Sequence, residues 1–257
     1  MNLFDILILS IVEGITEFLP VSSTGHLILT TFVLGIKQTD FVKCFEIAIQ
    51  LGAILSIVVL YGRSLFIDIR VIKRILVAFI PTAIMGAIFY KIIKTFFMGN
   101  CKIVLWSLFL GGIILILFEL RYKEKNGSLT DIRAMSYTQA LIIGLFQSVA
   151  LIPGVSRAAA TIIGGLSLGL RRQTIVEFSF LLAVPTMLAA TVFDVWKNYS
   201  VFTQAHFVFL LIGTAASFIA ALVSVKFLVG FLKKHNFVVF GVYRMLIALL
   251  FWLIVKI

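Results

Sequence analysis

The sequence predicts an all-α protein that crosses a membrane several times, and three observations support this fold class. Hydrophobic residues make up 61% of the 257 residues, and the mean hydropathy is +1.16. Charged residues make up only 13%, about half the share of an ordinary soluble domain. Several apolar runs reach the roughly 20 residues that a helix needs to cross the hydrocarbon core. Because lipid offers no partner to backbone N–H and C=O groups, these runs are expected to be helices.

The first apolar stretch, at about residues 3–35, is interrupted near its middle by FLPVSSTGH (18–26), which contains a proline, a glycine and several polar residues. A spanning helix broken in this way is costly in lipid unless protein buries the break. We therefore expect a re-entrant hairpin, in which two helices are joined by a tight turn and return to the same side.

The rest of the chain alternates spans with a second stretch of the same kind. The stretch at about 136–170 is interrupted by LIPGVSRAA (151–159) and is expected to form a second re-entrant hairpin. The prediction is therefore six transmembrane helices plus two re-entrant helical hairpins. The six spans are expected at about 44–61, 75–93, 103–120, 176–196, 206–229 and 237–256.

The two interrupted motifs resemble each other, which favours an inverted repeat. A second echo relates AFIPTAIMGAIF (78–89) to LAVPTMLAATVF (182–193), although at a different spacing. We expect a single membrane domain with halves 1–120 and 136–257, joined by the polar loop 121–135 (RYKEKNGSLTDIRAM).

The distribution of basic residues predicts the orientation. With six spans and two returning hairpins, thirteen Lys and Arg fall on one side and seven on the other. The richer side is cytoplasmic by the positive-inside rule, so both termini and the entry of the first hairpin lie outside. The net charge of +11 then reflects topology and anionic lipid rather than nucleic acid.

The first interrupted stretch carries two acids. Glu13 and Glu17 are four residues apart and share a helix face. Two carboxylates side by side in an apolar segment need a divalent cation, a shared proton or a nearby arginine. Because oxygen ligands suit hard cations, we expect Mg²⁺ or Ca²⁺ there.

The residues that follow the acids favour an anion site. Pro20 ends the first helix, and Ser22, Ser23 and Thr24 begin the next one with hydroxyls and free N–H groups. His26 lies one turn into that helix. Each hydroxyl taken alone is more often a helix cap, and His26 alone is about as often an interfacial residue.

The second interrupted stretch supplies a positive charge. Gly154 and Ser156 precede Arg157, and Thr161 follows one turn later. An arginine is a bidentate donor that matches phosphate, and one without an acid in its own segment is a functional candidate. If the two turns meet, two carboxylates, an arginine and two helix N-termini converge, a set that suits a diphosphate with a metal ion. A purely structural role, through backbone carbonyls, is the alternative for Arg157.

Other polar residues in the spans have simpler explanations. Glu46 and Glu177 are expected near the starts of their spans, where the helix dipole stabilises an acid. Arg244 is expected to reach the membrane surface or to pair with a carboxylate.

EGITEFLPVSSTGH (13–26) and PGVSRAAAT (153–161) resemble the two signature motifs of the bacterial undecaprenyl-diphosphatase family linked to bacitracin resistance. The resemblance covers nearly the whole chain and includes FEIAIQLGAIL (45–55), EFSFLLAVPT (177–186) and YR (243–244). It implies a multi-pass protein of the bacterial inner membrane. The implied activity hydrolyses undecaprenyl diphosphate to undecaprenyl phosphate and inorganic phosphate, with a divalent cation, for peptidoglycan synthesis.

By the same resemblance, the acidic motif falls on Glu13 and Glu17, as metal ligands. The serine-histidine element falls on Ser22, Ser23 and His26, and the phosphate-binding motif falls on Ser156, Arg157 and Thr161. One departure is Ala158, where the family has a second serine, which puts a catalytic duty at that position in doubt.

The mechanism expected from these residues is phosphoryl transfer. Arg157 clamps the phosphoryl group, with Ser22, Thr24, Gly154, Ser156 and Thr161 around it. Ser23 is the leading nucleophile with His26 as acid or base, and metal-activated water is nearly as good a candidate. The alternative function is a secondary transporter or flippase of polyprenyl phosphate lipids, because broken helices are also a transporter design. The sequence leaves a homodimer open.

Overall fold

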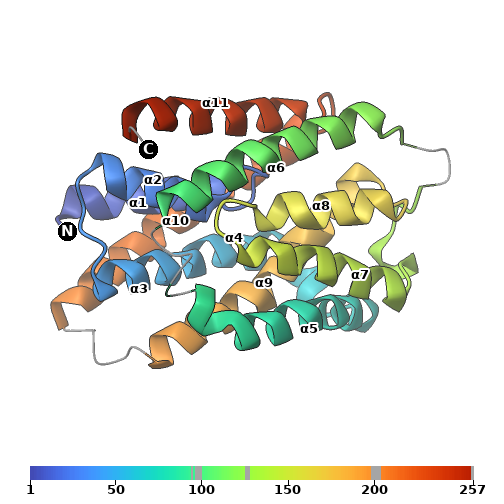
Figure 1. Cartoon of the computed structure of the whole chain (residues 1–257). Coiled ribbons are helices and arrows are strands. Elements are labelled where there is room, and N and C mark those ends of the chain that lie inside the picture. Colours follow the sequence, from blue (N-terminus) through green and yellow to red (C-terminus); the bar gives the residue numbers. More distant parts are fainter. Residues whose placement is uncertain (94, 96–99, 125–127, 198–203, 256–257) are drawn as a thin grey trace.

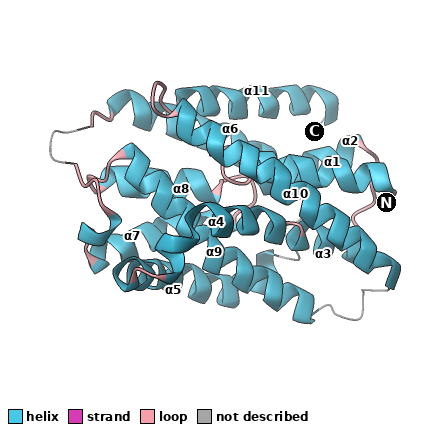
Figure 2. Cartoon of the chain, turned by 180° about the vertical axis from the view of Figure 1, so that it is seen from behind, coloured by secondary structure: helices cyan, strands magenta, loops and turns pink. Residues whose placement is uncertain are grey.

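The described part of the chain is a bundle of α-helices, as the sequence predicts (Figures 1 and 2). The structure is a computed structural model and describes residues 1–93, 95, 100–124, 128–197 and 204–255. Lys94, Lys125 and Lys256, which the charge count included, lie outside these residues. In chain order the helices are α1 (Leu3–Thr16), α2 (Ser23–Val33), α3 (Asp40–Ala48), α4 (Gln50–Phe66), α5 (Ile69–Ile92), α6 (Cys101–Arg121), α7 (Tyr137–Ser148), α8 (Arg157–Ser167), α9 (Arg172–Lys197), α10 (Gln204–Phe231) and α11 (Val238–Val255).

In the part of the chain that the structure describes, five of the six expected spans lie on one helix each and the first lies on two, and the number of membrane crossings stays a prediction. Within the described residues, five helical segments are long and apolar enough to cross a membrane, and α7 and α11 are shorter apolar helices. Many large apolar side chains on these helices are exposed, which suits contact with lipid. The first span differs from the expectation, because its helix is interrupted at Ile49, between α3 and α4.

Both interrupted stretches form two helices joined by a turn, and their re-entry into the membrane stays a prediction. Figure 1 shows the hairpin of α1 and α2 at the end of the bundle that holds both termini, and the hairpin of α7 and α8 at the opposite end. The turns of the two hairpins lie near the middle of the bundle. A 3-10 turn, Val149–Leu151, precedes the break in the second hairpin.

The helix packing relates the two hairpins to each other. The first helix of each hairpin lies along a long helix of the other part of the chain: α1 along α10, and α7 along α5. In this arrangement α5 occupies the place that corresponds to α10. The echo between 78–89 and 182–193 relates α5 to α9 instead, so it does not identify corresponding helices. The division into two halves stays a prediction.

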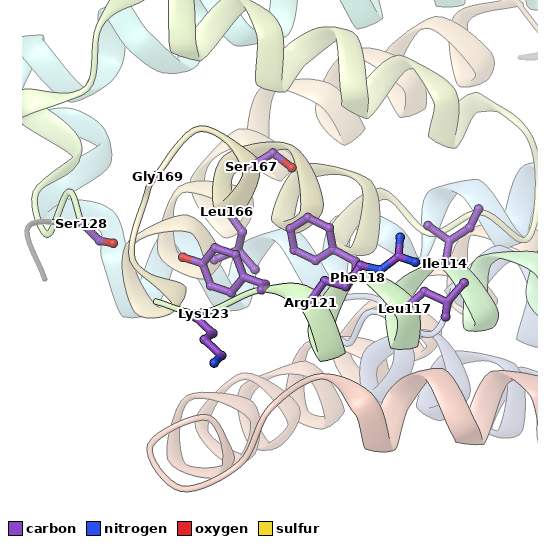
Figure 3. Close-up of a pocket in the computed structure, with 10 residues that line it drawn as sticks. Ile114, Leu117, Phe118, Arg121, Lys123, Ser128, Leu166, Ser167 and Gly169 are labelled. Carbon is purple, nitrogen blue, oxygen red and sulfur yellow. The ribbon is translucent and has the colours of Figure 1, made fainter. Parts of the chain in front are cut away.

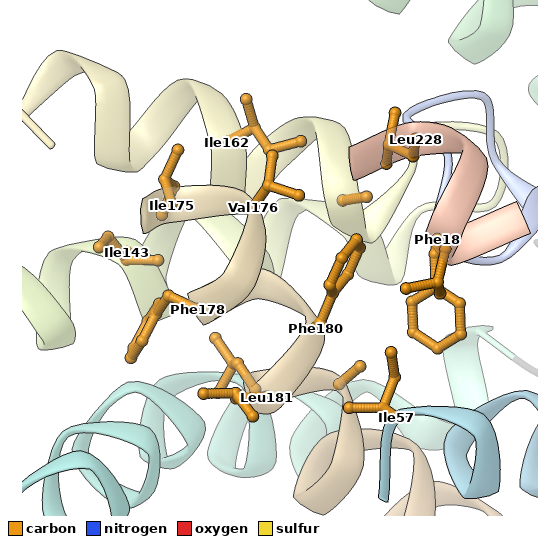
Figure 4. Close-up of a cluster of buried hydrophobic side chains, with 14 of the residues drawn as sticks. Phe18, Ile57, Ile143, Ile162, Ile175, Val176, Phe178, Phe180, Leu181 and Leu228 are labelled. Atoms are coloured by element: carbon orange, nitrogen blue, oxygen red, sulfur yellow. The ribbon is translucent and has the colours of Figure 1, made fainter. Parts of the chain in front are cut away.

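The hydrophobic core surrounds α9, whose side chains meet those of α4, α7, α8 and α10 (Figure 4). Phe18, just after α1, packs edge-on against Phe180 of α9, with 5.3 Å between the ring centroids. Both side chains are fully buried, and Ile57 of α4 belongs to the same cluster. The core therefore supports the first hairpin directly beneath its turn.

Two glycines let α6 and α11 approach closely. A Cβ at Gly112 would lie 2.7 Å from the carbonyl oxygen of Gly241, and a Cβ at Gly241 would lie 2.9 Å from that of Gly112. Small residues at a helix crossing are a common way to pack helices in a membrane. This crossing brings Arg244, one turn after Gly241, against α6.

Ion pairs tie the junction of the predicted halves together. Arg172 pairs with Glu119 at the end of α6 and, at 3.1 Å, with Glu124. In the loop, the Arg133 side chain donates hydrogen bonds to the Asp131 carboxylate and lowers its pKa. Part of the positive charge on this side of the bundle is therefore neutralised within the protein.

Candidate active site

The turns of the two hairpins share one unusual backbone conformation, at the serine before the second helix. Among the described residues, Ser22 (φ 73°) and Ser156 (φ 76°) are the non-glycine residues with positive φ. Each is the N-cap of the second helix of its hairpin, and its hydroxyl accepts a hydrogen bond from the N–H three residues later. Both hydroxyls thus serve as caps, and the first N–H groups of each helix remain available to an anion.

The acidic pair lies at the end of α1. Glu17 is the C-cap, still in helical conformation, so it shares a face with Glu13 as predicted. The Ser23 hydroxyl donates a hydrogen bond to the Glu17 carboxylate. Glu13 is fully buried, and neither of its carboxylate oxygens has a hydrogen-bond partner among the described residues. A buried carboxylate without a partner is costly, so a cation or a proton is needed there.

Arg157 reaches the acidic pair from the second hairpin. Its Nη2 lies 3.5 Å from Oε1 of Glu17, and its Nη1 donates to the carbonyl oxygen of Ser179 at 2.7 Å. The Nε group has no acceptor among the described residues. The predicted convergence of the two hairpins is therefore confirmed for Glu17 and Arg157.

A serine that the sequence analysis did not single out holds Arg157 in place. Ser179 lies in the N-terminal third of α9 and is fully buried. Its hydroxyl is 2.6 Å from that of Thr161, which also donates to the carbonyl oxygen of Arg157 at 3.0 Å. Thr161 therefore links the backbone of Arg157 to Ser179, which binds the arginine side chain. The only signal in the sequence was a serine inside the apolar run EFSFLLAVPT.

His26 is hydrogen-bonded to groups other than the two acids. Its Nδ1 lies 2.8 Å from the carbonyl oxygen of Ser22, and its Nε2 lies 2.9 Å from the hydroxyl of Tyr243. The two rings are stacked, with 5.5 Å between centroids. Neither ring nitrogen is hydrogen-bonded to Ser23, the expected nucleophile. The acid-base role of His26 therefore stays a prediction. Thr24, at the turn, is partly exposed.

Arg244 is the largest departure from the sequence analysis. Its side chain is fully buried and donates to the carbonyl oxygens of Pro20 at 3.3 Å, Ser107 at 3.1 Å and Gly154 at 2.9 Å. The expectation that it reaches the membrane surface or pairs with a carboxylate is wrong, because two non-helical turns leave carbonyl groups that need a donor. Gly154, at φ +94°, is pressed against α6, where a side chain would not fit.

Two acids also differ from their expected placement. Glu46 lies near the C-terminal end of α3 and is buried, and Gln38 donates a hydrogen bond to it at 3.1 Å. Glu177 lies beyond the first turn of α9. The helix dipole therefore explains neither position. α3 ends just before Ile49, so Glu46 lies at the wrong end of its helix, and α9 begins earlier than expected, so Glu177 lies too far from its start.

The candidate site itself is closed. Glu17, Ser23, His26 and Ser156 are each less than 9% exposed. A cavity of about 580 Å³ lies elsewhere, between the C-terminal ends of α6 and α8, and is lined by Arg121, Lys123 and apolar side chains (Figure 3). It includes none of the predicted site residues.

Comparison with known proteins identifies close relatives. The family model described as bacitracin resistance protein BacA matches residues 6–250. An undecaprenyl-diphosphatase of Aquifex aeolicus (strain VF5) is 54% identical over 251 residues, which cover 98% of each chain. Undecaprenyl-diphosphatases of Sulfurihydrogenibium sp. (strain YO3AOP1) and Persephonella marina are both 51% identical, over 98% and 99% of this chain and 99% and 100% of theirs.

Proposed function

The chain belongs to the bacitracin resistance protein BacA family, and on that premise we propose that its buried site hydrolyses undecaprenyl diphosphate to undecaprenyl phosphate and inorganic phosphate. The observation that carries the assignment to this site is the meeting of Glu17 with Arg157, from hairpins that enter the bundle at opposite ends. The names of the relatives give no support to the transporter reading.

The residues of the first hairpin fit a divalent cation, Mg²⁺ or Ca²⁺. Glu13 offers two buried oxygens without partners, and Glu17 is its nearest acid. No group of three or more His, Cys, Asp or Glu side chains suited to a metal is found among the described residues. The remaining ligands are therefore expected to be phosphate oxygens and water, as is common for Mg²⁺. The ion would neutralise charge on the diphosphate.

The second hairpin would hold the phosphoryl group. The guanidinium of Arg157 is fixed by Ser179 through Nη1, which leaves Nε without an acceptor and free for a phosphate oxygen. Nη2, which lies 3.5 Å from Oε1 of Glu17, would exchange that contact for a second phosphate oxygen. The free N–H groups at the start of α8 add donors that require no side-chain movement. Ser156 and Thr161 act by fixing the helix start and the arginine, and Ser22 and Gly154 fix the two turns.

Ser23 is the nucleophile in the reaction that we favour. Its hydroxyl is already hydrogen-bonded to Glu17, which would accept the proton as Ser23 Oγ forms a bond to the terminal phosphorus. The bond from phosphorus to the bridging oxygen breaks, and undecaprenyl phosphate leaves. Water then hydrolyses the phosphoserine and releases inorganic phosphate. Direct attack by water on the lipid is the competing route.

The proposed arrangement in the membrane has six spans and two re-entrant hairpins in an inverted repeat, with the termini outside. The pairing of α1 with α10 and of α7 with α5 supports the repeat. The first hairpin enters from the side of the termini, so the acids approach from the outer face of the inner membrane.

The decisive experiment is phosphate release by the purified protein in detergent, with undecaprenyl diphosphate as the substrate. We expect release that stops when a chelator is added and returns with Mg²⁺ or Ca²⁺. A protein that only moves the lipid across the membrane would release no phosphate, and this result would reject the proposed function. Full activity in the chelator would reject the cation.

Acid quenching separates the two routes of attack. With lipid labelled in its terminal phosphate, the wild type should yield labelled phosphoserine, and Ser23→Ala should yield none. Ser22→Ala is the matched control, because that hydroxyl is a helix cap. Undiminished turnover without labelled protein would favour the attack by water.

A further inference from the structure

Arg244 of α11 touches both hairpin turns and α6 at once. Its Nη1 donates to the carbonyl oxygen of Pro20 in the first turn, and its Nη2 donates to those of Gly154 in the second turn and Ser107 of α6. The hydrogen bonds recorded for the Arg244 side chain among the described residues all go to carbonyl oxygens, and no ion pair joins it to an acid there. Its hydrogen bonds are thus with the backbone.

We propose that Arg244 is a positioning residue that fixes the two hairpin turns relative to each other, so that Glu17 and Arg157 meet. This inference rests on the proposed function of the site. Pro20 is three residues from both Glu17 and Ser23, and Gly154 is three residues before Arg157. Holding the two carbonyl groups on one guanidinium therefore sets the distance between the acidic side and the basic side of the site.

The chemistry of arginine suits this task. The two turns are not helical, so their carbonyl groups have no intrahelical donor, and lipid supplies none. A guanidinium carries five N–H groups in a rigid planar fork and can serve several carbonyls that lie in different directions. A lysine ammonium is a compact charge on a flexible stem and cannot hold the same acceptors at fixed separations.

The surface of α6 provides independent support. A Cβ at Gly111 would lie 2.8 Å from Cζ of Arg244, so α6 leaves the space of a side chain for the guanidinium. The crossing at Gly112 and Gly241 brings the two backbones together beside it. A methyl group at Gly111 should therefore displace the guanidinium without removing its charge.

This gives two variants that disturb the same contact by different means. Arg244→Lys keeps the charge and loses the fork, and Gly111→Ala keeps the arginine and moves it. A shift of about 1 Å in catalytic groups can lower a rate by about a hundredfold. We expect kcat, per folded enzyme, to fall by at least about tenfold in both variants, with a smaller change in KM.

Two controls match these changes elsewhere in the chain. Arg74 also donates to backbone carbonyls, those of Met135 and Arg70, far from the hairpin turns, and Arg74→Lys should leave kcat within about threefold of the wild type. Gly62→Ala places a methyl group on α4 with only the Phe66 ring at 3.9 Å, and should behave likewise. Size-exclusion profiles and thermal unfolding in detergent give the folded fraction of each variant.

A double mutant tests whether Arg244 acts through Arg157. If it does, Arg157→Lys and Arg244→Lys together should lower kcat by little more than the stronger single change, because both act on one interaction. Multiplied effects, or a kcat within about threefold of the wild type in either Arg244→Lys or Gly111→Ala, would overturn the inference. If Arg244→Lys does not fold, Gly111→Ala carries the test alone. Absence of phosphate release by the wild type would instead overturn the proposed function.

Discussion

The two hairpins share the backbone conformation of the serine that ends each turn, and they carry opposite charges. In both, a serine at positive φ caps the second helix, and a carbonyl group of the turn accepts a hydrogen bond from Arg244. The first hairpin carries Glu13 and Glu17, whereas the second carries Arg157. A site divided in this way is complete only when both hairpins reach the middle of the bundle.

The helices that lead to the turns, α1 and α7, each carry a buried polar side chain, and the two side chains differ in their hydrogen bonds. When Pro20 is aligned with Pro153, Gln147 of α7 falls at Gly14, next to Glu13. Gln147 donates to the hydroxyls of Thr82 at 2.9 Å and Thr186 at 3.1 Å. Glu13 has no such partner among the described residues. The amide oxygen of Gln147 also lacks a partner there, so the two side chains differ in that Gln147 is held through its amide nitrogen, whereas the Glu13 carboxylate makes no hydrogen bond and is left for a ligand or a proton.

The largest effect is expected from breaking the contact between the hairpins. Arg157→Lys keeps a charge but loses the bidentate geometry that fits a phosphoryl group. We expect kcat to fall by about two to three decades, or about 3–4 kcal/mol of transition-state stabilisation. Phosphate release by purified variants, corrected for the folded fraction, measures this loss.

Arg171→Lys is the control for that change. Arg171 also pairs with a carboxylate, Glu124, at 2.8 Å, but at an exposed position. Exposed pairs contribute little, so its kcat should stay close to that of the wild type. An Arg157→Lys enzyme that turns over as fast as this control would show that the second hairpin does not supply the phosphate clamp.

The sequence predicted the hairpins and their convergence because the physical costs are local. An interrupted apolar helix must be buried in protein, and two neighbouring acids in lipid need a positive partner. Arg157 follows the turn of the second interrupted stretch, which resembles the first, and in the structure it lies against Glu17. These inferences needed only the types of residue and their spacing.

The rest depended on contacts between distant segments. Nothing near Arg244 in the sequence indicates carbonyl groups of Pro20 and Gly154, which lie in other elements. Tyr243 lies 217 positions from His26 in the sequence, so its hydrogen bond to the imidazole could not be predicted from residue spacing. Ser179 gave no periodic signal, because a single hydroxyl in an apolar helix has many uses. Such roles follow from packing, which the spacing of residues does not determine.

A smaller effect on activity is expected from the polar contacts of α7 than from the acid at the matching place in α1. Gln147→Leu removes hydrogen bonds between helices that contribute about 0.6–1.7 kcal/mol in membranes. We expect a lower temperature of unfolding with kcat kept within a few-fold. Glu13→Gln is the matched change in the first hairpin: it should lower kcat by more than about tenfold and raise the cation concentration required. Equal losses of kcat in the two variants would contradict the division of roles.

The smallest effect is expected at the turns, where the two hairpins should respond alike. Glycine adopts positive φ without the cost that serine bears, roughly 1 kcal/mol or more, and as an N-cap it loses only a few tenths. Ser22→Gly and Ser156→Gly should therefore leave the free energy of unfolding unchanged or slightly higher. The corresponding alanine variants lose the cap and keep the strain, so they should be less stable than the glycine variants by about 1 kcal/mol.

Ser136, the N-cap of α7, separates relief of strain from loss of a cap. Its φ of −72° is ordinary, so Ser136→Gly loses part of the cap and gains nothing from the backbone. It should lower the temperature of unfolding in detergent, whereas the glycine variants at the turns should not. If only one turn tolerated glycine, the strain would belong to that hairpin alone. A shared response would mean that one backbone device serves both the acidic and the basic side of the site, because Ser22 and Ser156 each cap the helix that follows its turn.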